Sequence, residues 1–139
     1  MFRIGCHLSS SKGFLAMGRQ AVSIGADTFQ YFSRNPRGSA VKETDPADVK
    51  AYLQYAEEHR LSPPLVHAPY TLNACSANPD LRAFARDTMI DDLRRLRVIP
   101  GAMYNFHPGS HVGQGIEEGI RAIAETLTVL LEKEGHSTV

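Results

Sequence analysis

The sequence is poor in cysteine, has no long apolar run and carries no excess of charge, and each absence excludes a class of protein. The two cysteines, Cys6 and Cys75, are far apart and form no Cys-x-x-Cys pair. Residues 1–7 lack the apolar core of a signal peptide, and no apolar run approaches the roughly 20 residues of a membrane span. We therefore expect a reduced, cytoplasmic protein with no membrane partner.

The net charge is zero, because fifteen basic residues balance fifteen acidic ones, and it gives no argument for a nucleic-acid partner. The distribution is uneven. Residues 1–42 hold six basic groups against Asp27 alone, a balance of +5, whereas residues 43–139 hold nine basic and fourteen acidic groups, a balance of −5. This asymmetry is typical of a face that meets an anionic partner, and it is equally typical of a solvated surface.

The chain has the length and composition of one domain, with 139 residues of which 42% are apolar and 22% charged. It is too short for a complete (β/α)8 barrel, which typically needs about 250 residues. Short β-branched and aromatic runs alternate with segments whose apolar residues recur at helical spacing. This alternation predicts an α/β fold of four parallel βα units, which fits part of a closed barrel or a doubly wound sheet.

Capping and turn residues set the expected boundaries. Asp45-Pro46 and Asn78-Pro79 each predict a helix start, because the first side chain accepts from exposed N–H groups and proline has no N–H to satisfy. Ser10 or Ser11 is expected near the cap of the first helix. We expect strands at residues 2–7, 28–32, 65–67 and 102–106, and the start of another strand at Thr138-Val139. We expect one helix at residues 12–24, two helices that begin at residues 46 and 79, and a fourth that runs from residue 116 to a stop at residue 135.

Histidines stand at the ends of three of the four predicted strands, at His7, His67 and His107. The carboxyl ends of parallel strands form the face where ligands and catalytic groups gather. A single histidine there is usually structural, but three on one face favour a metal or substrate site, because neutral imidazole is a common zinc ligand. Two of them are followed at once by rigid turns, in the runs His67-Ala68-Pro69-Tyr70 and His107-Pro108-Gly109-Ser110-His111.

These two runs resemble the endonuclease IV family of zinc-dependent apurinic/apyrimidinic (AP) endonucleases. The blocks Gly5-Cys6-His7-Leu8-Ser9 and Phe32-Ser33-Arg34-Asn35-Pro36-Arg37 are similar to the first and second strand ends of that family, and the resemblance covers residues 1–139. It implies a TIM (β/α)8 barrel of the xylose-isomerase-like type, and hydrolysis of the DNA backbone on the 5′ side of an abasic site in base excision repair. It also implies a trinuclear zinc cluster, a double-stranded DNA partner and a monomeric full-length enzyme.

The resemblance also implies roles for six residues. His67 and His107 match zinc ligands, Arg37 matches a side chain on a loop that penetrates damaged duplex, and Tyr70 matches a residue that wedges into the DNA. A multi-zinc site suits this reaction because it supplies a nucleophile near neutral pH and neutralises phosphate charge, and abasic recognition needs phosphate contacts and side chains that fill a gap. Asn35 is a weaker substrate candidate beside Arg37, and His7 is expected to contact substrate or a ligand rather than zinc. No residue of the chain is assigned as catalytic.

The length is where the sequence departs from the family. The remaining family ligands lie in the second half of the barrel, and the first of them would be a glutamate at the end of the strand that Thr138-Val139 begins. We therefore expect residues 1–139 to be a single, truncated domain, the first half of the barrel, and to be inactive alone. Two alternatives stay open: a metal-dependent sugar isomerase or epimerase on a similar barrel, and a non-catalytic DNA-binding half barrel that self-associates to cover its strand edges.

Overall fold

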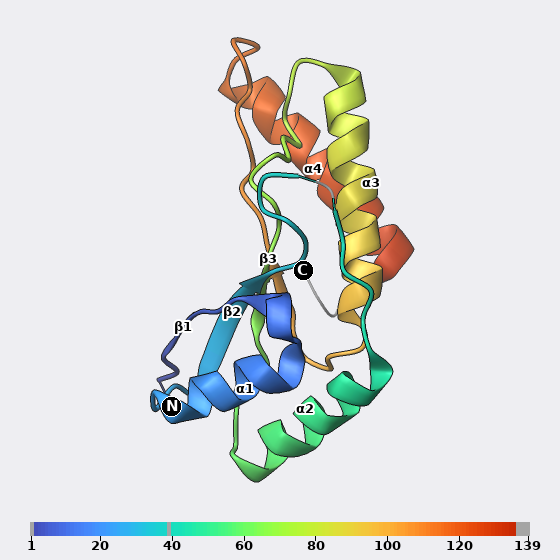
Figure 1. Ribbon diagram of the computed structural model, residues 1–139. Coiled ribbons are helices and arrows are strands. Elements are labelled where there is room, and N and C mark those ends of the chain that lie inside the picture. The colour runs from blue at the N-terminus through green and yellow to red at the C-terminus, as the bar shows by residue number, and fades with distance from the viewer. Residues whose placement is uncertain (1, 39, 136–139) are drawn as a thin grey trace.

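The computed structural model describes residues 2–38 and 40–135, in which strands and helices alternate along the chain (Figure 1). All the strand pairs are parallel, and the sheet order is β1-β2-β3-β4, which confirms the predicted α/β class and its βα units. The elements are β1 (Gly5–His7), a 3-10 turn η1 (Ser10–Lys12), α1 (Phe14–Ser23), β2 (Thr28–Phe32), α2 (Pro46–Glu58), β3 (Leu65–His67), α3 (Pro79–Leu96), β4 (Met103–Asn105) and α4 (Ile116–Glu134).

The helices α2 and α3 begin where the sequence predicts. Asp45 Oδ1 accepts a hydrogen bond of 2.8 Å from the N–H of Ala47, and Asn78 Oδ1 accepts one of 2.8 Å from the N–H of Asp80. A proline follows each cap in the first turn of its helix. Both starts are therefore fixed by neighbouring residues, which is why the sequence alone locates them.

The start of α1 differs from the prediction, which placed it at Lys12 with a serine cap. Ser9 instead caps the 3-10 turn, and α1 begins at Phe14 after Gly13, whose φ of 93° lies in the left-handed region. The cap of α1 comes from α2, because Asp48 accepts hydrogen bonds from the N–H groups of Phe14 (2.5 Å) and Leu15 (3.2 Å). A carboxylate suits this position because the helix N-terminus is electropositive.

Two strands are shorter than predicted. β1 begins at Gly5, which pairs with Thr28 at the first residue of β2, so the segment before it has no neighbouring strand to pair with. Ile4 is instead held by Asp27, whose N–H donates to the Ile4 carbonyl at 2.8 Å. β4 ends at Asn105, so His107 lies two residues beyond the strand. The predicted strand start at Thr138-Val139 lies outside the described residues.

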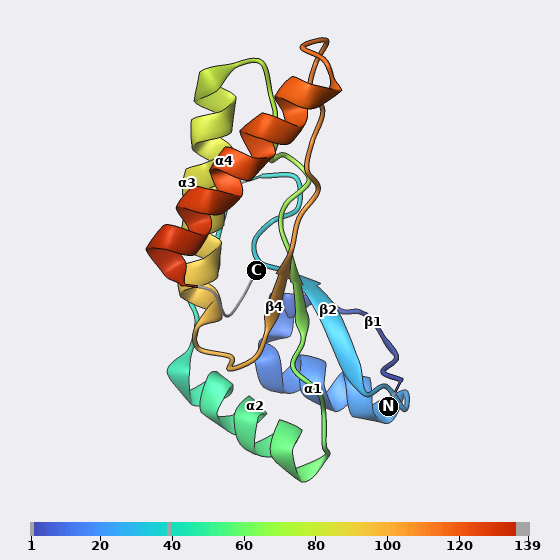
Figure 2. The same ribbon diagram turned by 180° about the vertical axis from the view of Figure 1, so that it is seen from behind.

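The two faces of the sheet have different surroundings. Alternate strand residues, among them Phe29, Tyr31, Val66 and Tyr104, are buried with helix residues in one core. Figure 2 shows the opposite face toward the viewer, with α1 behind the strands and α2 beside α1. On that face Met103 is 56% exposed, and His7 and Asn105 are exposed too. The sheet is therefore covered by helices on one side only in the described part of the chain.

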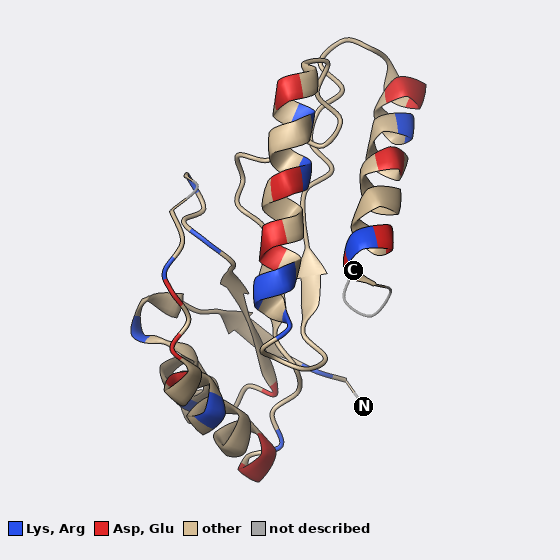
Figure 3. Ribbon diagram, turned by 90° about the vertical axis from the view of Figure 1, so that its right-hand side faces the viewer, with Lys and Arg blue, Asp and Glu red and all other residues tan. Residues whose placement is uncertain are grey.

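Apolar residues recur at helical spacing along α4, at Ile116, Ile120, Ile123, Leu127 and Leu131. They lie beside the buried positions of the helix, which are Gly119, Ala122, Thr126, Leu130 and Glu134. Ile116 and Ile120 are 70% and 57% exposed. The side chain of Glu134 is buried and accepts hydrogen bonds from Arg94 (2.9 Å) and Arg97 (2.6 Å), which join the two helices. Acidic residues lie along both α3 and α4 (Figure 3).

Candidate functional site

The histidines expected at one face lie together at the carboxyl edge of the sheet. The ring centroids of His67 and His107 are 5.1 Å apart, and the ring of Tyr70 lies 5.6 Å from His67 and 5.8 Å from His107. His67 is the last residue of β3, whereas His107 follows β4 and Tyr70 belongs to the β3–α3 loop. The parallel strands therefore bring two separate strand–histidine–turn segments to one place.

Phe32 lies between two of the three histidines, His7 and His67, and also contacts Tyr70. Its ring lies 5.1 Å from those of His67 and Tyr70, and 4.5 Å from the ring of His7. Phe32 is the last residue of β2 and pairs in register with His67. Sequence reasoning had no chemical reason to select this phenylalanine, because its contribution is contact rather than reactivity.

His67 is held in one tautomer. It is 7% exposed, and its Nδ1 lies 2.6 Å from the carbonyl oxygen of Ala68. Because a carbonyl only accepts, Nδ1 carries the proton, and Nε2 keeps a lone pair. This is the arrangement in which metal-binding histidines are commonly oriented.

The chemistry of the two imidazoles fits a metal ion, although they do not complete a ligand set. His107 is exposed, so its ring is free to meet an ion. Within residues 2–38 and 40–135, no group of three or more His, Cys, Asp or Glu side chains could hold a metal ion. Two imidazoles alone leave a typical zinc coordination sphere incomplete.

His7 is arranged differently from His67. The Gln30 side-chain amide donates to His7 Nδ1 at 2.9 Å, so the proton of the neutral ring lies on Nε2. Burial, followed by electrostatic repulsion from the His67 imidazole, lowers the pKa of His7. His7 is exposed, so the Nε2–H of the neutral ring is a donor that a partner can reach.

Arg37 and Asn35 lie on the loop between β2 and α2. Arg37 is exposed, whereas the Asn35 side chain is used within the loop, because its Oδ1 accepts a 3.0 Å hydrogen bond from the Arg37 N–H. The same loop reaches the next one, since the N–H of Tyr70 donates to the Pro36 carbonyl at 3.0 Å. Tyr70 is 60% exposed. An exposed cation and an exposed aromatic ring thus stand on two joined loops.

Arg34 is not available to a partner in the way its charge suggests. Its side chain is 6% exposed and its Nη2 lies 2.6 Å from Asp92 Oδ1 and 2.8 Å from Asp91 Oδ2. Asp92 also accepts from the hydroxyls of Ser33 and Tyr104, each at 2.7 Å. The balance of +5 over residues 1–42 therefore overstates the exposed positive charge. The sequence feature that could have indicated this pairing is the position of Asp92, which falls at helical spacing among the buried residues of α3, such as Met89 and Leu96.

The family follows from the comparison of the chain with known proteins, since residues 19–139 match one domain family. The chain belongs to the xylose isomerase-like TIM barrel family. Its four parallel βα units are half of the eight that such a barrel repeats.

Relatives within this TIM barrel family carry a more specific name. The chain is 56% identical over 139 residues to a probable endonuclease 4 of Clostridium beijerinckii, covering 100% of this chain and 50% of the relative. It is 52% identical to a probable endonuclease 4 of Akkermansia muciniphila, over 98% of this chain and 49% of the relative. The crystal structure of endonuclease IV from Thermus thermophilus matches with a TM-score of 0.81 at 27% identity, over 97% of this chain and 48% of that one.

The chain spans about half the length of the curated relatives it matches. No helix in the described part of the chain is long and apolar enough to cross a membrane.

Proposed function

We propose that residues 1–139 form the first half of a zinc-dependent AP endonuclease of the endonuclease IV type, which hydrolyses the phosphodiester bond 5′ to an abasic site in duplex DNA. The observation that carries the proposal is the pair of imidazoles of His67 and His107, 5.1 Å apart beside Tyr70 at the carboxyl edge of the sheet. The relatives named endonuclease 4 support it, because the similarity includes the whole of this edge.

In this proposal His67 and His107 hold zinc. His67 offers Nε2, because its Nδ1 proton is donated to the Ala68 carbonyl, and His107 offers an exposed ring. When bound, zinc supplies Lewis-acid chemistry for phosphodiester hydrolysis. The remaining ligands come from a second half barrel, and the chain alone does not cleave abasic DNA, because two imidazoles do not hold a cluster of zinc ions.

The DNA contacts in this proposal come from the joined loops. Arg37 supplies a cation for the phosphates of the damaged strand, and Tyr70 supplies a ring for the gap where a base is missing. Asn35 shapes the Arg37 loop through its own backbone hydrogen bond rather than by reading a base. His7, which is exposed and whose Nδ1 already accepts from Gln30, contacts substrate or a ligand through its Nε2–H.

A second candidate, a DNA-binding half barrel without chemistry, is favoured by the incomplete ligand set among the described residues. A sugar isomerase on a similar barrel is less well supported, since a small sugar needs neither an exposed Arg37 nor an exposed Tyr70 on a protruding loop. Zinc binding at the two histidines distinguishes the proposed enzyme half from this DNA-binding half barrel.

The experiment that tests the metal role is a zinc titration of the chain followed by NMR of its histidine side chains. The resonances of His67 and His107 should shift together, and His67→Ala or His107→Ala should remove the response of the other ring. His59→Ala is the matched control, because His59 caps the end of α2 and stacks on Tyr55, away from the sheet edge. Zinc shifts that are unchanged in both His67→Ala and His107→Ala would contradict the metal role.

A further inference from the structure

Two loops run side by side beyond the carboxyl ends of β3 and β4, and each carries part of the candidate site (Figures 1 and 2). The β3–α3 loop, residues 68–78, carries Tyr70, and the β4–α4 loop, residues 106–115, carries His107. Side-chain amides, rather than a strand ladder, make the hydrogen bonds that join residues 70–78 to residues 107–115.

Asn73 makes the first connection, and it uses both ends of its amide. Oδ1 accepts from the N–H of Ser110 at 3.1 Å, and Nδ2 donates to the carbonyl of the same residue at 3.0 Å. Oδ1 also accepts from the N–H of Cys75 at 3.2 Å, which fixes the side chain to its own loop. Only an amide offers an acceptor and a donor in this geometry; a carboxylate would place an oxygen against the Ser110 carbonyl.

The approach of Asn73 to the second loop requires glycine at position 109. A Cβ there would lie 2.1 Å from Asn73 Oδ1, and Gly109 has a φ of 93°. The sequence Pro108-Gly109 therefore does more than turn the chain after His107. It leaves the space into which the Asn73 amide fits.

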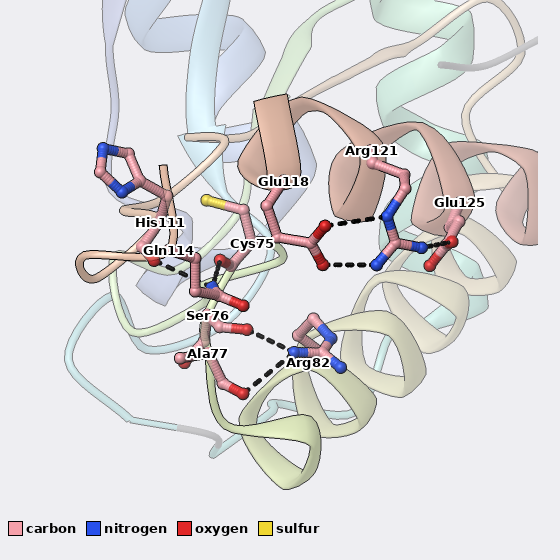
Figure 4. Close-up of polar contacts among 9 residues, drawn as sticks. All are labelled: Cys75, Ser76, Ala77, Arg82, His111, Gln114, Glu118, Arg121 and Glu125. Carbon is pink, nitrogen blue, oxygen red and sulfur yellow. Dashed lines mark hydrogen bonds and ion pairs between the residues drawn. The ribbon is translucent and has the colours of Figure 1, made fainter. Parts of the chain in front are cut away.

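Gln114 makes the reciprocal connection from the other loop (Figure 4). Its Nε2 donates to the carbonyl of Cys75 at 3.2 Å and to the carbonyl of His111 at 2.9 Å. Arg82 holds the far end of the first loop to α3, since its Nη1 donates to the Ser76 carbonyl at 2.6 Å. Each loop thus sends one amide to the backbone of the other, and we call Asn73 and Gln114 the amide clamp.

We propose that Asn73 is a positioning residue, and that the amide clamp sets the distance of His107 from His67 and Tyr70. His107 is exposed and stands two residues beyond β4, so neither burial nor the sheet fixes its ring. Ser110, three residues on, is bound to Asn73 through both its N–H and its carbonyl. The effect of Asn73 on zinc affinity rests on the proposed function, whereas its effect on the position of the His107 ring does not.

The direct test is the set of ring-to-ring nuclear Overhauser contacts of His107 with His67 and Tyr70, measured on the metal-free chain. Asn73→Ala should remove or strongly weaken both sets, and the Ser110 amide should exchange with solvent at least tenfold faster. Asn78→Ala is the matched control, because Asn78 lies on the same loop and caps α3 with a similar hydrogen bond but does not contact the second loop. It should keep both sets of contacts.

The zinc affinity of the same variants supplies the second measurement. Asn73→Ala and Asn73→Asp should weaken zinc binding at least fivefold at a temperature where each is folded, and Asn78→Ala should leave it unchanged. Ring contacts that persist in Asn73→Ala, or that are lost equally in Asn78→Ala, would overturn the positioning role. If Asn73→Ala does not fold, Gln114→Ala decides instead, since Gln114 is exposed and its loss should weaken the same contacts. A wild-type chain that binds no zinc would refute the zinc proposal. The ring contacts of His107 would then decide whether the amide clamp positions this residue.

Discussion

Arg34 Nη2 lies 2.6 Å from Asp92 Oδ1, and the two side chains are 6% and 0% exposed. Arg34 lies at the start of the β2–α2 loop, just before Asn35 and Arg37, and Asp92 lies on α3. A buried charge pair thus anchors the base of the loop that we propose meets DNA. Asp91, which also contacts Arg34, is 56% exposed.

This pair predicts unequal effects of two neighbouring substitutions. Asp92→Asn should lower the free energy of unfolding by about 3 kcal/mol, because it leaves the buried guanidinium without its main counter-charge. Asp91→Asn should cost less than about 1 kcal/mol, as is usual for an exposed ion pair. Urea unfolding of the two variants measures both values, and equal losses would show that burial of Asp92 does not govern the pair.

The cap that α2 gives to α1 predicts a local effect. Asp48→Ala should destabilise the protein by about 1 kcal/mol, because the N–H groups of Phe14 and Leu15 lose their acceptor. Hydrogen exchange of these two amides should accelerate. Asp48→Asn should retain protection at only one of them, because the two N–H groups bond to different carboxylate oxygens and an amide keeps one acceptor oxygen. Unchanged exchange at Phe14 in Asp48→Ala would contradict the cap.

Three buried tyrosines predict a loss of stability in alkali. Burial raises the pKa of Tyr52 to about 12, and it raises the pKa values of Tyr31 and Tyr104 further, with Asp92 contributing to both shifts. Because these hydroxyls ionise near pH 10 once unfolded, the unfolded state releases protons that the folded state keeps. The stability they contribute is present below about pH 10 and falls as the pH rises above it.

Urea unfolding midpoints below and above pH 10 measure this slope. Tyr104→Phe should make it shallower, because one of the three hydroxyls is gone. An identical slope in the variant would mean that Tyr104 does not remain protonated in the folded protein.

Helix starts and contacts that depend on neighbouring residues could be predicted from the sequence. Those that depend on residues far away along the chain could not. Asp45 and Asn78 cap the helices that they precede, so α2 and α3 begin as expected. The cap of α1 comes from a residue 34 positions along the chain, and the carboxylate that neutralises Arg34 lies 58 positions away. Strand polarity placed His67 and His107 together, but the tautomer of His67 depends on a contact that only the structure shows.

The DNA-contact role of Arg37 is tested in a completed protein, in which residues 1–139 are fused to the half of the Clostridium beijerinckii relative that this chain does not match. Arg37→Ala should weaken binding to abasic duplex and make the salt dependence of binding shallower by about one phosphate contact. Zinc content should not change. Arg60→Ala, at the end of α2, is the matched charge control, and equal affinities of the Arg37→Ala and Arg60→Ala proteins across salt concentrations would contradict the role.

The most direct measurement is the incision of a labelled duplex that carries one abasic site, with zinc present, by the chain alone, by the fusion and by the fusion with His107→Ala. We predict no incision by the chain alone, chelator-sensitive incision 5′ to the abasic site by the fusion, and loss of that incision in the His107→Ala fusion with its folding intact. Full incision by a folded His107→Ala fusion of normal zinc content, or chelator-sensitive incision by the 139-residue chain alone, would contradict the proposed division of the site.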